Sequence, residues 1–180
     1  MARFALAVVA AAMSLAAAQD EMIDNPEYKG WAGQKVGAWV KFNMVREVGE
    51  RKMDTTTTTT LKEISAEKAV IDQATEMDMG GQKKTMNMSR TLPAKVKKGT
   101  DSEGSKTEPI AEGDEEVEIA GKKYACHWAE MKITSKQGVM TVKVWRNDKI
   151  VGGAAKLTMT MEKPMKMTMT MNALEWKAGE

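Results

Sequence analysis

The sequence KLTMTMEKPMKMTMTM, from Lys156 to Met171, decides the fold class because its apolar and polar residues alternate. Neighbouring side chains on a β-strand point to opposite faces, so this spacing predicts two strands with a row of thioethers on one face. The turn between them is expected at Glu162-Lys163-Pro164. Six methionines occupy odd positions in this stretch: Met159, Met161, Met165, Met167, Met169 and Met171.

The same two-residue period continues through most of the chain. It recurs in Val36 to Met44, and Thr55 to Thr60 fit a strand whose two faces both tolerate water. Glycines at 80–81, 121 and 152–153 mark tight turns between alternating runs. The fold class is therefore all-β, an antiparallel meander that forms a strongly curved sheet or half-barrel. Asn25 to Gly33 predicts a short N-terminal helical turn, with Asn25 as N-cap and Pro26 at the first position.

The N-terminus has the pattern of a secretory signal peptide. Arg3 precedes an apolar run over Phe4–Ala12, and the small residues Ala16-Ala17-Ala18 predict cleavage near Ala18-Gln19. The apolar run is shorter than the roughly 20 residues of a membrane-spanning helix. Residues 1–18 are thus expected to be a signal peptide, and the protein to be periplasmic or secreted with no membrane span.

Residues 19–180 are expected to form a single β domain with a long polar loop at about 94–114, which is rich in charge, glycine, serine and proline. Only Arg3 among the 27 basic residues, and none of the 25 acidic residues, lies in the signal peptide. The mature chain is therefore nearly neutral and has no electrostatic preference for nucleic acid.

Catalysis has little support in the sequence. Cys126 is the only cysteine and His127 the only histidine. As neighbours on a strand they point to opposite faces, which is poor geometry for a nucleophile and its base or for a zinc site. A lone cysteine in an exported protein is expected to be buried. We predict a protein that is not an enzyme and that needs no cofactor.

The methionines leave three interpretations open. They can fill an ordinary sheet core, or they can form an adaptable surface for a lipid or another apolar small molecule. In the second case the six methionines from Met159 to Met171 are the ligand-binding residues. Other strands could add Met44, Met86, Met88, Met131 and Met140. Since thioethers also suit Cu(I), the third interpretation is a copper site at Met165, Met167, Met169 and Met171.

Two tryptophans lie out of phase with the apolar faces of their strands. Trp39 lies between Ala38 and Val40, and Trp145 follows Val144. Because neighbouring side chains on a strand point to opposite faces, both tryptophans point away from these apolar residues, to the second face of the sheet. This second face is therefore expected to be covered by the N-terminal turn, by the long loop or by another chain. Trp39 and Trp145 are the candidate contacts to a protein partner.

Four segments resemble a family of uncharacterised exported bacterial β-rich proteins: NPEYKGWAGQKVGAWVKF, LKEISAEKAVI, VEIAGKKYACHWAE and VKVWRNDKIVGGAAKL. The shared patterns are N-P-x-Y-x-x-W, G-K-K-x-x-C-x-W and V-W-x-x-D-x-x-x-G-G. The chain departs from the family at Asn147 and Val151, where serine and proline are expected. The resemblance implies an exported β-protein and supplies no activity.

In compartment and strand pattern the chain is also similar to the LolA/LolB-like periplasmic half-barrels, whose concave face holds acyl chains. This resemblance implies lipid binding, although the sequence has no counterpart of their long helices. The function expected from the sequence is non-catalytic binding of an apolar ligand on a methionine-lined face. The alternatives are a periplasmic Cu(I)-binding protein and a structural or interaction module.

Overall fold

A computed structural model describes residues 21–78, 82–98, 105–136, 138–163 and 165–180. The predicted signal peptide lies outside the described residues, as do Gly80 and Gly81 of one predicted turn. The described elements, in chain order, are β1 (Met22–Asp24), α1 (Pro26–Ala32), β2 (Trp39–Val48), β3 (Arg51–Ile64), β4 (Lys68–Asp78), β5 (Lys83–Pro93), β6 (Lys95–Lys97), β7 (Lys106–Ile119), β8 (Lys122–Ser135), β9 (Gly138–Arg146), β10 (Ala154–Lys163) and β11 (Met167–Lys177).

Nine of these strands form one antiparallel sheet in the order β5-β4-β3-β2-β11-β10-β9-β8-β7. The sheet consists of two meanders, β2 to β5 and β7 to β11, which meet where β2 pairs with β11. The remaining two strands, β1 and β6, pair with each other in a short ribbon. The all-β antiparallel prediction is therefore confirmed, with the addition that the last strand returns to the first strand of the main sheet.

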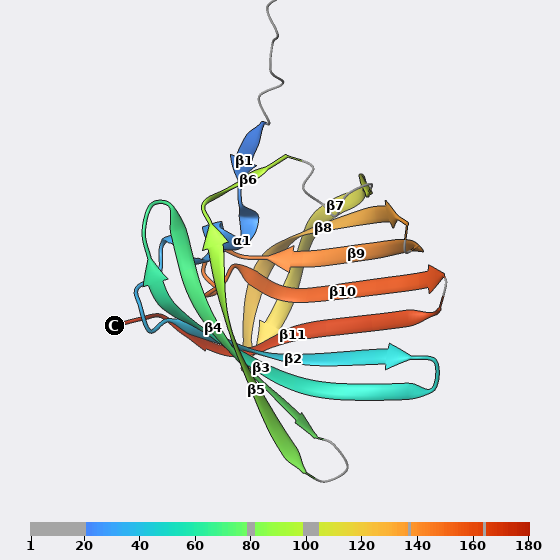
Figure 1. Ribbon diagram of the computed structural model, residues 1–180, viewed down its shortest axis with the longest axis horizontal. Helices are drawn as coiled ribbons and strands as arrows, with labels where there is room; N and C mark the ends of the chain where they lie inside the picture. Colours follow the sequence, from blue (N-terminus) through green and yellow to red (C-terminus); the bar gives the residue numbers. More distant parts are fainter. Residues whose placement is uncertain (1–20, 79–81, 99–104, 137, 164) are drawn as a thin grey trace, which may run out of the picture.

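The sheet is strongly curved and is not closed into a barrel. In Figure 1, β9, β10 and β11 run across one side, while β3, β4 and β5 turn away from them and form a second arm. The two edge strands, β5 and β7, do not pair with each other in the described part of the chain. We call the inner surface between the two arms the concave face and the opposite surface the back face.

Helix α1 begins as predicted and is fastened to the β5 arm. The Asn25 side chain accepts a hydrogen bond from the backbone N–H of Glu27 at 3.0 Å, and Pro26 occupies the first turn. Asn25 also donates to the carbonyl oxygens of Pro93 and Ala94, through its side chain at 2.8 Å and its backbone at 2.9 Å. The hydroxyl of Tyr28 donates to the Ser65 carbonyl at 2.7 Å. These bonds hold the helix between the two arms.

Glycine allows the other side of α1 to approach the β9–β10 turn. Gly30 accepts a hydrogen bond from the backbone N–H of Gly152 at 3.0 Å, and a Cβ atom at Gly30 would overlap the Gly152 carbonyl. Gly152 has a φ of 78°, a conformation that favours glycine. The ring of Trp31 and the side chain of Val40 both lie next to Gly152, and Trp31 is 3% exposed. Helix α1 therefore bridges both arms at one end of the sheet.

The back face is covered by the chain itself. The tip of the β7–β8 hairpin passes behind the ends of β9, β10 and β11, and β7 contacts β10 and β11 (Figure 1). Ile119 and Cys126 on this tip are buried in the same core as Trp145 and Ala155. A cover for the second face was predicted, but it is this hairpin rather than the N-terminal turn or the long loop.

Two predictions require correction. The range 94–114, expected to be a polar loop, contains β6, which pairs with β1, and the beginning of β7, which pairs with β8; this pairing overrides the low strand propensity of the charged residues. The threonine strand does not expose both faces to water, since Thr57 and Thr59 are 9% and 4% exposed. Both threonines lie on the concave face, where neighbouring strands and the α1 end of the sheet cover them.

We expect Gly30→Ala to lower the free energy of unfolding by about 1–3 kcal/mol, because the added methyl group has no space against the Gly152 backbone. Urea denaturation followed by tryptophan fluorescence measures this loss. Gly33→Ala is the matched control, since nothing lies within 4 Å of its added Cβ atom and its φ is −94°. Equal effects of the two substitutions would contradict the proposed close approach of α1.

Candidate functional site: the methionine-lined concave face

Strand register brings the methionines together on the concave face. Met159 pairs with Met169 and Met161 with Met167 across β10 and β11. The row continues through β9 and β8 on one side and through β2 on the other. We call the following residues the methionine face: Met44, Met131, Met140, Met159, Met161, Met167, Met169 and Met171.

Every member of the methionine face is partly exposed to solvent, and none belongs to the buried core. The core consists instead of residues such as Val40, Leu61 and Ile71, near α1, and of those beneath the β7–β8 tip. Methionine is flexible and polarisable, so a partly exposed row of thioethers is a surface that adapts to different apolar shapes. These residues are thus more exposed than the core, although Met171 packs against it.

A cavity of about 300 Å³ opens at the α1 end of the methionine face. Its apolar wall includes Trp31 from α1, Phe42 from β2, Val144 from β9 and Leu157 from β10, together with Met44 and Met171. Strands from both arms line this one cavity, although β5 and β9 are separated by five strands in the sheet. The curvature of the sheet therefore creates the cavity, and its volume is at the lower end of the range for small-molecule pockets.

The β3–β4 wall of the cavity is polar but internally hydrogen-bonded. The Thr57 hydroxyl lies 3.0 Å from the Thr75 hydroxyl. The Gln73 side-chain amide donates to the Thr59 hydroxyl at 3.4 Å. These groups satisfy one another, which allows them to line a largely apolar cavity at low cost.

Two guanidinium groups lie at the cavity, and their surroundings differ. Arg90 on β5 makes a paired contact with Glu27 on α1, with both N–O distances 3.2 Å. Arg146, the last residue of β9, also lines the cavity and is exposed. Within the described residues Arg146 makes no side-chain hydrogen bond or ion pair. The cavity thus has one neutralised and one free positive charge.

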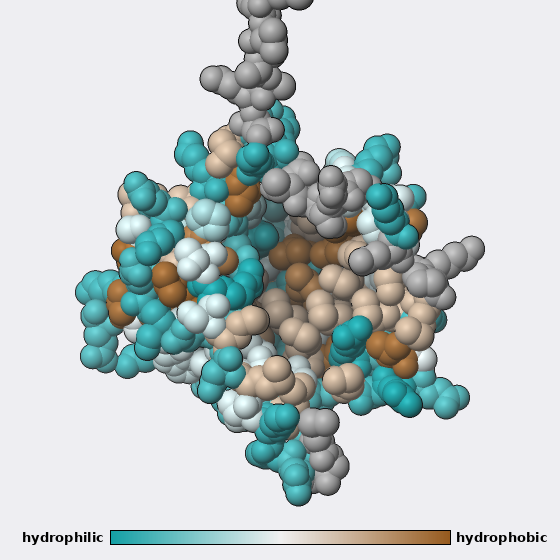
Figure 2. Space-filling model, viewed as in Figure 1, coloured by the Kyte–Doolittle hydropathy of each residue, from teal (hydrophilic) through white to brown (hydrophobic). Residues whose placement is uncertain are grey.

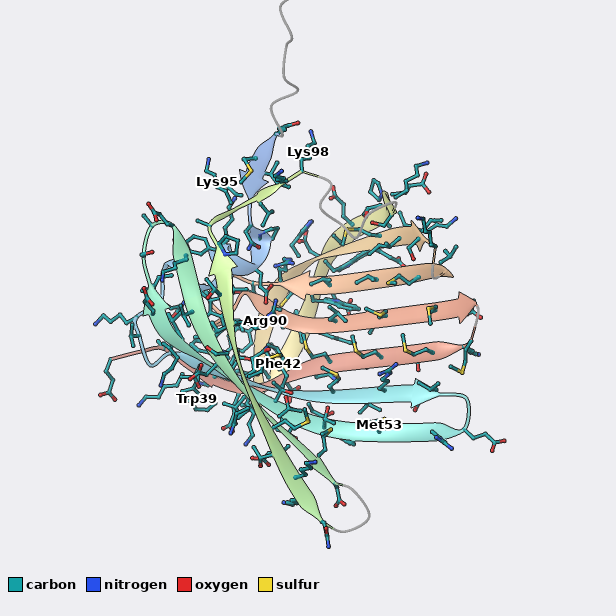
Figure 3. All side chains as sticks on the ribbon, in the orientation of Figure 1. Trp39, Phe42, Met53, Arg90, Lys95 and Lys98 are labelled. Atoms are coloured by element: carbon teal, nitrogen blue, oxygen red, sulfur yellow. The ribbon has the colours of Figure 1, made fainter. Side chains whose placement is uncertain are left out.

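Figures 2 and 3 show this arrangement from the concave side. In Figure 2 apolar residues gather over β9, β10 and β11 around a hollow beside the β5 arm, and hydrophilic residues surround them. Figure 3 labels Arg90 and Phe42, which line the same cavity, where the two arms approach each other. Met53, labelled in Figure 3, lies near the outer end of β3 and is 51% exposed. It pairs with Arg46 on β2, which pairs on its other side with Met169 on β11, so Met53 lies on the same face of the sheet as Met169.

The structure separates one of the six predicted ligand-binding methionines from the others. Met165 precedes β11 and is 55% exposed, whereas the other five share the concave face. The predicted Cu(I) set is divided in the same way, because only Met167, Met169 and Met171 lie on the sheet. Met86 and Met88 share this side of the sheet but lie on the opposite arm, on β5, where both are more than half exposed.

Sequence reasoning did not identify the cavity residues Trp31, Phe42, Leu157, Arg90 and Arg146. The apolar ones were visible only as members of alternating runs. Placing them at one cavity requires the β2–β11 pairing, which joins residues more than a hundred positions apart. Arg146 had no signal of its own in the sequence.

The two candidate partner-facing tryptophans have different surroundings. Trp145 is 5% exposed, and its indole N–H donates to Glu115 on β7 at 2.8 Å, so it packs inside this chain rather than facing a partner. The ammonium groups of Lys143 and Lys156 each lie 4.7 Å from the centre of a Trp145 ring. Trp39 is partly exposed on the back face beside Lys177 and remains accessible.

Cys126 and His127 lie on opposite sides of β8, as predicted. Cys126 is 1% exposed and unpaired. Burial raises the pKa of its thiol, and the nearby Glu115 carboxylate raises it further. His127 is exposed, with Nδ1 3.2 Å from a carboxylate oxygen of Asp114.

Comparison with known proteins gives no family. No family model matches the chain, and neither does any curated protein. A Bacteroides fragilis protein described as exported, with a YmcC-like fold, aligns at a TM-score of 0.45 and 8% identity over 82% of this chain and 98% of its own. A DUF1329 family protein from Desulfovibrio piger aligns at a TM-score of 0.34 and 8% identity over 82% and 87%. The site is therefore interpreted from its own geometry.

We expect iodoacetamide to label Cys126 in the urea-unfolded chain and to leave it unlabelled in the native protein over the same time. The thiolate is the reactive form, and burial both excludes the reagent and keeps the thiol protonated. Mass spectrometry of the alkylated protein measures the difference. Rapid labelling of the native protein would show that the β7–β8 tip does not cover the back face.

Proposed function

We propose that this protein is an exported, non-catalytic binding protein that holds an apolar ligand, such as the acyl chain of a lipid, on its concave face. The ligand lies along the methionine face, and its end occupies the cavity beneath α1. The observation that carries the proposal is the continuity between a partly exposed sulfur row and an apolar cavity on the same face of the sheet.

Exposure supports ligand binding over a purely structural role. Large contiguous apolar surfaces are uncommon on a protein without a partner or ligand. Burying such a surface stabilises it by about 25 cal/mol per Å² relative to leaving it in water. Each methylene group of a ligand buried against this face would contribute about 0.8 kcal/mol. The polar residues that would compete for water, such as Thr57 and Gln73, are already paired.

The N-terminal pattern supports export, and the described chain adds one observation on its relation to membranes. Among the described residues, no helix has both the length and the apolar character needed to cross a membrane.

A Cu(I)-binding protein is the second candidate function, and the strand register supports it. Met159 and Met169 are directly paired, as are Met161 and Met167, so two thioether pairs lie side by side across β10 and β11. Thioether sulfur is a soft donor that suits Cu(I). In this alternative the cavity under α1 has no role, which allows the two functions to be separated by experiment.

We expect Met169→Lys to weaken binding of the neutral fluorescent probe Nile red by about tenfold or more, because it places a charge between Met167 and Met171 and directly across from Met159. Thr170→Lys is the matched control, since it introduces the same side chain at the next residue of β11 but on the back face. Fluorescence titration measures both affinities, and circular dichroism checks that each variant is folded. Equal loss in both variants would contradict binding at the concave face.

Replacing Met167, Met169 and Met171 together by leucine separates the two functions. Leucine keeps the apolar surface, so we expect Nile red affinity to change less than about threefold, in line with the small cost of exchanging Leu and Met. Leucine has no sulfur lone pair, so a copper site would lose its affinity for Cu(I). A variant that loses Nile red and keeps Cu(I) would overturn the proposed function.

A further inference from the structure

We infer that the ligand of the concave face is a long-chain carboxylate whose headgroup is bound by Arg146. The inference rests on the proposed function, because it names the ligand class for the same cavity. It concerns the polar end of the ligand, which the methionine face leaves undetermined. The observation behind it is the free guanidinium at the rim of an otherwise apolar cavity.

Strand register fixes the place of Arg146 on the concave face. It follows Val144 by two residues on β9, so both point to the same side of the sheet, and Val144 forms part of the apolar wall. Its cross-strand neighbours are Ala154 on β10 and His127 on β8. The guanidinium therefore lies where the apolar cavity meets solvent, which is the expected position for the head of an amphiphile.

The other charged groups around the cavity make contacts of their own, and Asp114 and Glu112 share the single imidazole of His127. Glu27 neutralises Arg90 through two contacts of 3.2 Å. On the other side of Arg146, His127 lies against Asp114 at 3.2 Å and Glu112 at 3.9 Å. Arg146 thus contributes one positive charge for which the described residues supply no direct partner.

One free guanidinium fits a carboxylate better than a phosphate monoester. The planar fork of arginine binds both oxygens of a carboxylate, and the charges of the pair cancel. A phosphate monoester carries close to two negative charges at neutral pH and would leave one of them near Glu27. The paired hydroxyl and amide groups of Thr57, Thr59 and Gln73 add no free charge that would compensate.

The test compares laurate with its uncharged methyl ester, each displacing Nile red from the purified full-length mature protein. We expect Arg146→Met to weaken laurate binding by about tenfold to a hundredfold, because the variant loses one charge-assisted hydrogen-bonded pair between guanidinium and carboxylate. Methyl laurate and Nile red should bind the variant as they bind the wild type, because methionine preserves an apolar surface. Glu27→Gln, which frees Arg90, should strengthen laurate binding and leave the methyl ester unchanged.

Arg46→Met is the matched control, because Arg46 lies on the same face at the outer end of β2 and does not line the cavity. Equal weakening of laurate in the two arginine variants would overturn the inference in favour of general charge attraction. So would unchanged laurate affinity in Arg146→Met, or a dodecyl phosphate that binds more tightly than laurate and depends more on Arg146. If neither the methyl ester nor Nile red binds the wild type, the proposed function itself fails.

Discussion

The pairing of β2 with β11 is the constraint on which the rest of the structure depends. It joins the first and last strands of the main sheet and turns two separate meanders into one nine-stranded sheet. Because it aligns Met44 with Met171 and Phe42 with Ala173, it also places the apolar residues of both meanders on one face. The partners are far apart in sequence, so this pairing requires the whole chain and is expected to make folding slow.

A sheet has two faces, and this one covers them unequally. On the back face the β7–β8 tip packs its own buried residues, including Cys126, against Trp145. On the concave face α1 covers only one end, where Gly30 approaches Gly152 closely and Trp31 joins the same buried core as Val40. The remainder of the concave face is left with partly exposed thioethers and a cavity of about 300 Å³. The open site is thus a consequence of incomplete cover, and the flexibility of methionine suits a surface that is alternately wet and occupied.

Much of the architecture follows from alternation, because a two-residue period and glycine turns determine strands and hairpins locally. The methionine hairpin, the N-cap at Asn25 and the burial of Cys126 were predictable in this way. The cover of the back face was not, since the charged residues of β7 look like a loop until they pair with β8. The burial of Thr57 and Thr59 and the convergence of Arg90 and Arg146 at one cavity depend on curvature across many strands, which no local pattern encodes.

The most direct test of the account is native mass spectrometry of the mature protein, purified without detergent or added metal from the cells that make it. We expect a protein mass increased by that of a co-purified lipid-like molecule, which is released when the protein is unfolded. A copper-sized increment would contradict the apolar ligand and favour the paired thioethers as a metal site. A protein that carries nothing, and that gains no mass when incubated with long-chain lipids, would contradict the view that the concave face is a binding site.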